Sequence, residues 1–159
     1  SSKHQLVADF PEKFPVILAD ETRIEQVLAN LVSNSLKYAP QGEIRISGQV
    51  RPEQVIVCVS DQGAGIEAKD LPHIFDRFYR STNAVKQTKG AGLGLSLARA
   101  IVEAHGGRIW ADSSAGTGAK ICFSLPRGEA SRIHICNIHI QTIIEVVVDQ
   151  SEKYLQNQT

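Results

Sequence analysis

Asn30, Asn34 and Lys37 follow one another in steps of four and three residues, which places them on one face of a helix. An Asn side-chain oxygen is a hard neutral ligand, suited to a Mg²⁺ ion that keeps most of its waters and binds phosphates. Lys37 adds a positive charge for phosphate, and Tyr38 follows directly. The face borders an apolar stripe and therefore meets a cavity edge. Taken alone, it also fits the solvated edge of an ordinary amphipathic helix.

A second group of candidate residues is the glycine loop at 61–65, which follows a strongly apolar strand. The Asp61 carboxylate, at the end of that strand, can accept a hydrogen bond from an exocyclic amine such as that of adenine. Gly63 and Gly65 let the backbone approach a flat ring closely. An ordinary turn is the alternative, because Asp and Gly are common turn residues.

Two further blocks could contact phosphate. Arg80 ends the aromatic segment 74–80 and could reach a terminal phosphate, although a solvated arginine is the simpler interpretation. Glycines in the segment 90–95 precede a helix, where free N–H groups and the helix dipole favour anions. This run is neither a Walker motif nor a Rossmann fingerprint.

Hydrophobic periodicity predicts the elements that hold these residues. Asp20 can cap a helix whose apolar stripe runs from Ile24 to Ser35 and which Pro40 ends. Other helices are predicted at about 67–75 and 93–104, with a polar, lid-like loop at 80–91 between them. Strands are predicted as short pieces within 4–18, as a hairpin turning at 51–54, and at about 108–113 and 119–125. The pattern predicts an α/β (α+β) two-layer sandwich, with a mixed, mostly antiparallel sheet and helices on one face.

Composition narrows the functional class. The chain has 159 residues, with 17 basic and 17 acidic side chains, which argues against a broad electrostatic nucleic-acid binder. No apolar run approaches the roughly 18 residues of a membrane span. Methionine is absent, so we expect a fragment of a longer protein, with a cytoplasmic location for this part and membrane anchoring of the parent left open. Cys58, Cys122 and Cys136 are interpreted as small buried thiols in a reducing compartment.

In combination, the order and spacing of these blocks resemble the ATP-binding catalytic domain of sensor histidine kinases. That domain belongs to the GHKL superfamily of gyrase, the large heat-shock chaperones and mismatch-repair ATPases. The resemblance covers about residues 5–126 and implies the Bergerat fold, with ATP held under a flexible lid. The blocks resemble, in order, the N box, the first glycine box, the F box, the second glycine box and a last, shorter box: 30–38, 61–65, 74–80, 90–95 and 116–118.

The resemblance implies a role for each matching residue. Asn34 would bind Mg²⁺, Asp61 would bind adenine, and Arg80 would reach the γ-phosphate. The other residues implied to contact nucleotide are Asn30, Lys37, Tyr38, Gly63, Gly65, Ile66, Gly90, Gly92, Leu93, Gly94, Leu95 and Thr117.

The implied function is phosphoryl transfer from ATP to a histidine on a dimerisation domain of the same, dimeric parent, with a response regulator downstream. Hydrolytic relatives similar to gyrase carry a Glu four residues before the metal-binding Asn. Here that position is Asn30, and an amide cannot act as a general base, so we expect poor hydrolysis. No histidine in the chain has the acidic and proline context of the family's acceptor. We therefore assign no catalytic residue within this chain.

Two alternatives remain open at this stage. One is a GHKL serine kinase that doubles as an anti-sigma-type regulator, which the aromatic F box disfavours. The other is a non-catalytic, nucleotide-dependent interaction module, which Asn34, Asp61 and the glycine boxes disfavour.

The resemblance ends near Pro126, so we divide the chain into a catalytic domain at 1–126 and an extension at 127–159. Alternating isoleucines predict a strand with a bulge near Asn137, and the run 143–148 is predicted to be extended as well. We expect the extension to pair with a sheet edge; the first strand of a following receiver domain is the alternative.

Overall fold

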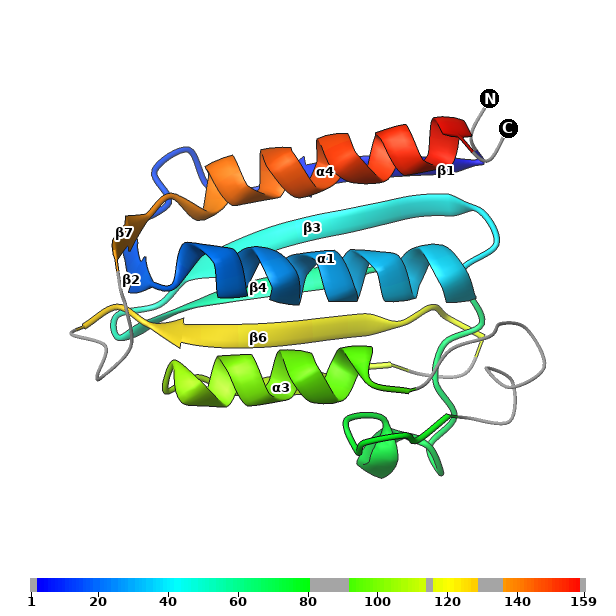
Figure 1. Ribbon diagram of the computed structural model, residues 1–159. Coiled ribbons are helices and arrows are strands. Elements are labelled where there is room, and N and C mark those ends of the chain that lie inside the picture. The colour runs from blue at the N-terminus through cyan, green and yellow to red at the C-terminus, as the bar shows by residue number, and fades with distance from the viewer. Residues whose placement is uncertain (1–2, 81–91, 114–115, 129–135, 158–159) are drawn as a thin grey trace.

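The computed structural model describes residues 3–80, 92–113, 116–128 and 136–157. These residues form two layers, a sheet and a row of helices lying side by side across it (Figure 1). The large sheet contains, in spatial order, β1 (His4–Asp9), β3 (Gly42–Val50), β4 (Gln54–Ser60), β6 (Lys120–Pro126) and β5 (Ile109–Ala111). The helices are α1 (Glu21–Tyr38), α3 (Gly94–Ala104) and α4 (Ile140–Asn157), with a short 3₁₀ turn η1 (Leu71–His73) and a second, two-stranded sheet of β2 (Ile17–Ala19) and β7 (Cys136–Ile138).

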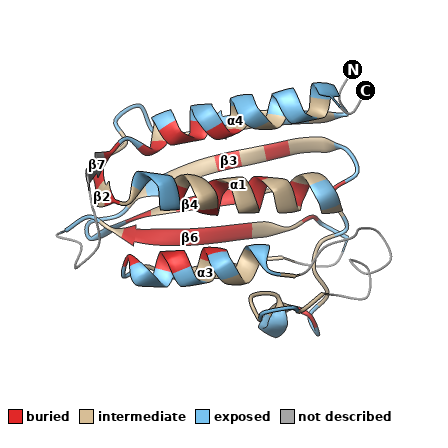
Figure 2. Cartoon of the chain, viewed as in Figure 1, coloured by how far each residue is buried: buried red, intermediate tan, exposed pale blue. Residues whose placement is uncertain are grey.

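The sheet confirms the predicted mixed, mostly antiparallel arrangement. β1 pairs in parallel with β3, whereas the other pairings of the large sheet are antiparallel. The predicted hairpin turn is present, and the Arg51 N–H donates to the Gln54 carbonyl at 2.8 Å. Buried residues gather between the sheet and the helices, and exposed residues lie on the outer helix surfaces (Figure 2).

Helix α1 forms as predicted and is the central helix of its layer. The Asp20 carboxylate accepts a hydrogen bond from the Arg23 N–H at 3.2 Å and so caps the first turn. Leu28 and Leu31, on the stripe that faces the sheet, are almost completely buried. The helix stops at Tyr38, just before Pro40, whose ring cannot continue it.

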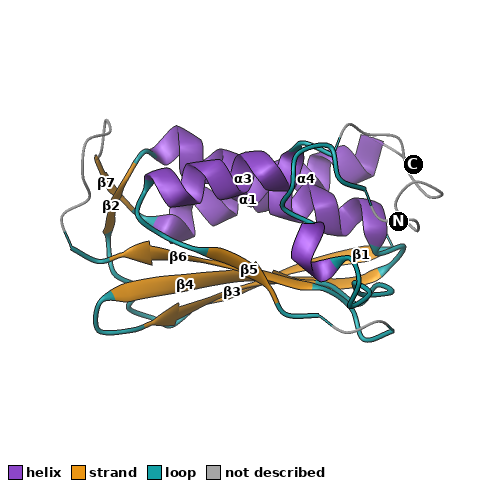
Figure 3. Ribbon diagram, turned by 90° about the horizontal axis from the view of Figure 1, so that it is seen from below, coloured by secondary structure: helices purple, strands orange, loops and turns teal. Residues whose placement is uncertain are grey.

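His105 fastens the end of α3 to the start of α1. Its Nε2 accepts from the Asp20 N–H at 3.1 Å, and its Nδ1 lies 2.8 Å from the Ile101 carbonyl. One nitrogen must accept and the other must donate, so the buried ring is the neutral tautomer with its proton on Nδ1. His105 therefore has a structural role at the junction of the two helices. Figure 3 shows the helices together on one face of the sheet.

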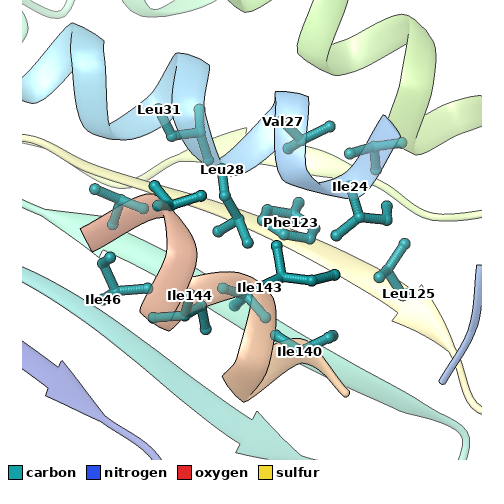
Figure 4. Close-up of a cluster of buried hydrophobic side chains, with 14 of the residues drawn as sticks. Ile24, Val27, Leu28, Leu31, Ile46, Phe123, Leu125, Ile140, Ile143 and Ile144 are labelled. Atoms are coloured by element: carbon teal, nitrogen blue, oxygen red, sulfur yellow. The ribbon is translucent and has the colours of Figure 1, made fainter. Parts of the chain in front are cut away.

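The extension differs from its prediction, because residues 143–148 lie in helix α4. Ile140, Ile143, Ile144 and Val147 recur at helical spacing, and each is at most 2% exposed. Figure 4 shows three of them beside side chains of α1 and β6. The extended prediction was wrong because β-branched residues favour strands in isolation, whereas here their spacing matches an apolar helix face that the core can bury. None of the described helices is long and apolar enough to cross a membrane.

The strand predicted before that run is present but short. β7 pairs with the chain's own β2, and Asn137 lies opposite Leu18 in regular register, so the described strand 136–138 has no bulge. The helix predicted at 67–75 is reduced to the single turn η1, because Pro72 supplies no N–H group to a longer helix.

Cys58 and Cys122 form a disulfide, which corrects the prediction of separate thiols. They lie directly opposite each other in the β4–β6 ladder, although 64 positions separate them in sequence. Their neighbours Val57 and Phe123 belong to the core. Because side chains alternate along a strand, the disulfide lies on the sheet face away from the helices.

We predict that Ile144→Ala lowers the free energy of unfolding by about 2–4 kcal/mol, because it leaves a cavity between α4 and the sheet. Val146→Ala, on the same helix but 40% exposed, is the matched control and should change stability by less than about 0.5 kcal/mol. Urea unfolding measures both. Equal losses in the two variants would show that α4 is not part of the core.

Candidate functional site

The polar face of α1 meets the start of α3. The Asn30 side-chain amide donates to the Gly94 carbonyl at 3.1 Å. Asn34 lies one turn further along α1, half-buried, and no described residue forms a hydrogen bond with its side chain. Lys37 is exposed in the last turn, and Tyr38 is half-buried.

Asp61 directly follows β4 and is held by two backbone amides. Its Oδ1 accepts from the Gly63 N–H at 3.0 Å and from the Ala119 N–H at 3.2 Å. The Asp61 N–H in turn donates to the Ala119 carbonyl at 2.9 Å. No donor from the described residues reaches Oδ2. The carboxylate is therefore fixed in orientation by one oxygen and can offer the other to a ligand.

Two glycines make this packing possible. Gly118 has a φ of +88°, and a Cβ there would lie 2.1 Å from the Asp61 carbonyl oxygen. A Cβ at Gly63 would lie 3.1 Å from Ala39, just beyond α1. The glycine loop therefore lies directly against the end of α1, the helix that carries Asn34.

The rest of this loop is joined to the segment before β6. The Ile66 N–H donates to the Ser113 hydroxyl, which donates to the Gly118 carbonyl, both at 2.9 Å. Gly65 has a φ of +78°, in the region that favours glycine. Sequence reasoning singled out Thr117 in this region and missed Ser113 and the Ala119 amide, because a serine hydroxyl and a backbone N–H carry no sequence pattern.

The F-box segment is held against the second glycine box. The Phe78 N–H donates to the Gly92 carbonyl at 3.0 Å, and a Cβ at Gly92 would lie 2.8 Å from the Tyr79 carbonyl oxygen. Arg80 and Gly92 are thereby brought to the same region, next to the start of α3. Leu93 is exposed and Leu95 packs against the core. Gly90 and the predicted lid lie outside the described residues.

A cavity of about 270 Å³ adjoins Asp61 but does not include Asn34. Ser60 and Lys120 line it, and they alternate with the core residues Val59 and Ile121. These two lining residues therefore face away from the helices. Thr117 lines this cavity together with Asp61.

Comparison with known proteins yields one family. The model described as "Histidine kinase-, DNA gyrase B-, and HSP90-like ATPase" matches residues 19–129. The chain is 42% identical to the sensor histidine kinase WalK of Bacillus subtilis, over 79% of this chain and 21% of WalK. It is 40% identical to the adaptive-response sensory kinase SasA of Synechococcus elongatus, over 79% of this chain and 33% of SasA. The chain thus spans only a minor part of these relatives.

Solved structures show the same fold. The catalytic domain of histidine kinase ThkA superposes with a TM-score of 0.68 at 32% identity, covering 79% of this chain and 81% of ThkA's. Full-length ShkA in complex with AMPPNP superposes with a TM-score of 0.70 at 28% identity, covering 80% of this chain and 27% of ShkA's. The five-stranded sheet and its helices therefore match histidine kinase catalytic domains, as the sequence predicted.

We predict that Gly118→Ala destabilises the protein by at least about 1–2 kcal/mol more than Gly116→Ala. Both glycines have a left-handed φ, so both substitutions add similar backbone strain. Only the new Cβ at Gly118 meets the Asp61 carbonyl, whereas a Cβ at Gly116 meets nothing within 4 Å. Thermal unfolding measures the difference, and equal midpoints would refute the close approach.

Proposed function

Because this chain belongs to the family of histidine kinase-, DNA gyrase B- and HSP90-like ATPases, we propose that it binds ATP with Mg²⁺ as the catalytic domain of a two-component sensor kinase. The observation that carries this proposal is the Asp61 carboxylate. It stands at the end of β4 beside a glycine loop, fixed by two backbone amides, and no donor from the described residues reaches its other oxygen. An ionised carboxylate only accepts hydrogen bonds, so it selects a ring with an exocyclic amine, such as adenine.

Mg²⁺ would be held by Asn34 together with the phosphates. The residues present fit such an ion, because the Asn34 amide lies between the Asn30–Gly94 contact and the glycine loop and has no described hydrogen-bond partner. Among the described residues no cluster of His, Cys, Asp and Glu could replace it as a metal site. A Mg²⁺ ion that keeps its waters and binds through phosphates needs few protein ligands. The bound ion would neutralise phosphate charge.

The chain's own residues would act by positioning the nucleotide. We assign adenine to Asp61, with Gly63, Gly65, Ile66 and Thr117 around it. Arg80 and Lys37 would supply positive charge for the phosphates, and Gly92 and Gly94 would let backbone come close to them. Tyr38, Leu93, Leu95 and Gly90 complete the proposed set.

The amide at Asn30 favours transfer of the phosphoryl group to a protein over hydrolysis of ATP. This amide is committed to the Gly94 carbonyl, and an amide cannot remove a proton from water. The phosphoryl group is therefore kept for a protein acceptor. None of the chain's histidines has an adjacent acid followed by a proline a few positions on. We infer an acceptor histidine outside residues 1–159, on a dimerisation domain of the same parent, which would pass the phosphoryl group to a response regulator.

The surface that would receive this acceptor domain is apolar. Phe78, Leu93 and Leu97 are 64%, 40% and 39% exposed. The Phe78 N–H contacts Gly92, next to Leu93, and Leu97 lies one helical turn beyond Leu93. Large exposed apolar side chains gathered at one place indicate an interaction surface. Its position beside the proposed phosphate contacts suits delivery of a phosphoryl group.

We predict that Asn34→Ala weakens Mg²⁺-dependent ATP binding about tenfold, because one oxygen ligand of the ion is lost. Asn34→Asp keeps an oxygen there and should retain most of the affinity. Gln26→Ala, on the same helix but far from the glycine loop, is the control. Calorimetry with and without Mg²⁺ measures the effect. Unchanged Mg²⁺ dependence in Asn34→Ala would contradict the metal assignment.

We also predict that this chain, incubated alone with γ-labelled ATP, forms no phosphohistidine and releases phosphate only slowly. The reasons are the missing acceptor context and the amide at position 30. The measurement is an assay for acid-labile label on the protein, with mass spectrometry to locate any labelled histidine. Label on His134 or His139 would show that the acceptor lies within this chain.

A further inference from the structure

The carboxylate of Asp70 is buried although the proposed function gives it no role. It is 5% exposed and precedes the turn η1. The Tyr79 hydroxyl donates a hydrogen bond to its Oδ1, and none of the ion pairs of the described residues includes Asp70. A buried carboxylate is costly unless it is hydrogen-bonded. The Tyr79 hydroxyl is therefore the side-chain group that satisfies Asp70.

The phenol is suited to this role. The hydrogen bond to Asp70 raises the pKa of Tyr79, and burial and the negative charges of Asp70 and Asp76 raise it further. Tyr79 therefore stays protonated, as a donor must. The centroid of its ring also lies 5.3 Å from the centroid of the His73 ring. The neighbouring pairs of Asp76 with His73 and Arg99 are exposed, and such pairs contribute little.

The backbone beside Tyr79 adopts an unfavourable conformation. Phe78 has a φ of +65°, the only positive φ of a non-glycine residue among the described residues. A bulky side chain disfavours this region, and such a conformation persists only when the surroundings impose it. The Phe78 side chain, 64% exposed, is not held by the core. The imposing contacts are the bond from the Phe78 N–H to Gly92 on one side and the Tyr79–Asp70 bond on the other.

We propose that Asp70 and Tyr79 are a positioning pair that, by holding the backbone of residues 78–80 against Gly92, sets the point from which Arg80 reaches the terminal phosphate of ATP. This inference rests on the proposed function and deepens it. Neither residue touches the nucleotide; both act through Arg80. The predicted consequence is selective, because ADP lacks the γ-phosphate. Loss of the pair should weaken ATP binding more than ADP binding, whereas a general loss of structure would weaken both equally.

The test is calorimetry of the full chain with Mg²⁺·ATP and Mg²⁺·ADP. Arg80→Ala and Tyr79→Phe should each lower the ratio of ATP to ADP affinity about five- to tenfold. Asp70→Asn keeps an oxygen acceptor and should lower the ratio only about two- to threefold. Tyr154→Phe removes an exposed tyrosine hydroxyl on α4 and is the matched control, with an unchanged ratio expected. Circular dichroism establishes that each variant is folded.

The outcomes are distinguishable. An unchanged ratio in folded Tyr79→Phe, or in Arg80→Ala, overturns the positioning role while leaving nucleotide binding intact. Failure of the wild-type chain to bind either nucleotide refutes the proposed function itself. If Tyr79→Phe does not fold, Asp70→Asn decides by its ratio. In that variant the pKa of Tyr79, followed by tyrosinate absorbance, should also fall towards its ordinary value of about 10, and an unmoved pKa would mean that the two side chains do not interact.

Discussion

The sheet has one apolar face, and only helices laid across that face can keep it from water. Phe123, at the centre of this face, is fully buried, with Leu28 of α1 and Ile143 of α4 in the same cluster (Figure 4). This burial fixes where each helix runs. It therefore also fixes where α1 ends and α3 begins, which is where the chain presents its polar loops.

The candidate site follows from that arrangement. With α1 seated on the sheet, Asn30 reaches the start of α3, and Ala39 lies against Gly63 in the loop after β4. Asp61 joins that loop to the segment before β6 through the Ala119 amide. Positions far apart in the sequence are thus brought together by backbone contacts and by glycines that allow them. The chemistry proposed for the site consists of holding a nucleotide in position, so it depends on where these contacts place the polar groups.

The parts of the fold that could be predicted are those with local causes. The stripe and cap of α1 and the hairpin turn at 51–54 each follow from neighbouring residues. The roles expected for the site residues came from the resemblance to the catalytic domain of sensor histidine kinases. Helix α4 was missed because its β-branched side chains favour a strand locally, whereas burial against α1 and the sheet stabilises them as a helix. The Cys58–Cys122 and Asp70–Tyr79 contacts were missed because each depends on register or folding that no local pattern encodes.

We propose that the nucleotide lies between the end of α1 and the loop after β4. Amide chemical shifts recorded during a titration with a non-hydrolysable ATP analogue and Mg²⁺ test it most directly. We expect large changes at Asn34, Gly63 and Ala119 and none along the exposed end of α4. Saturable binding that leaves those three amides unchanged, or that shifts α4 instead, would contradict it.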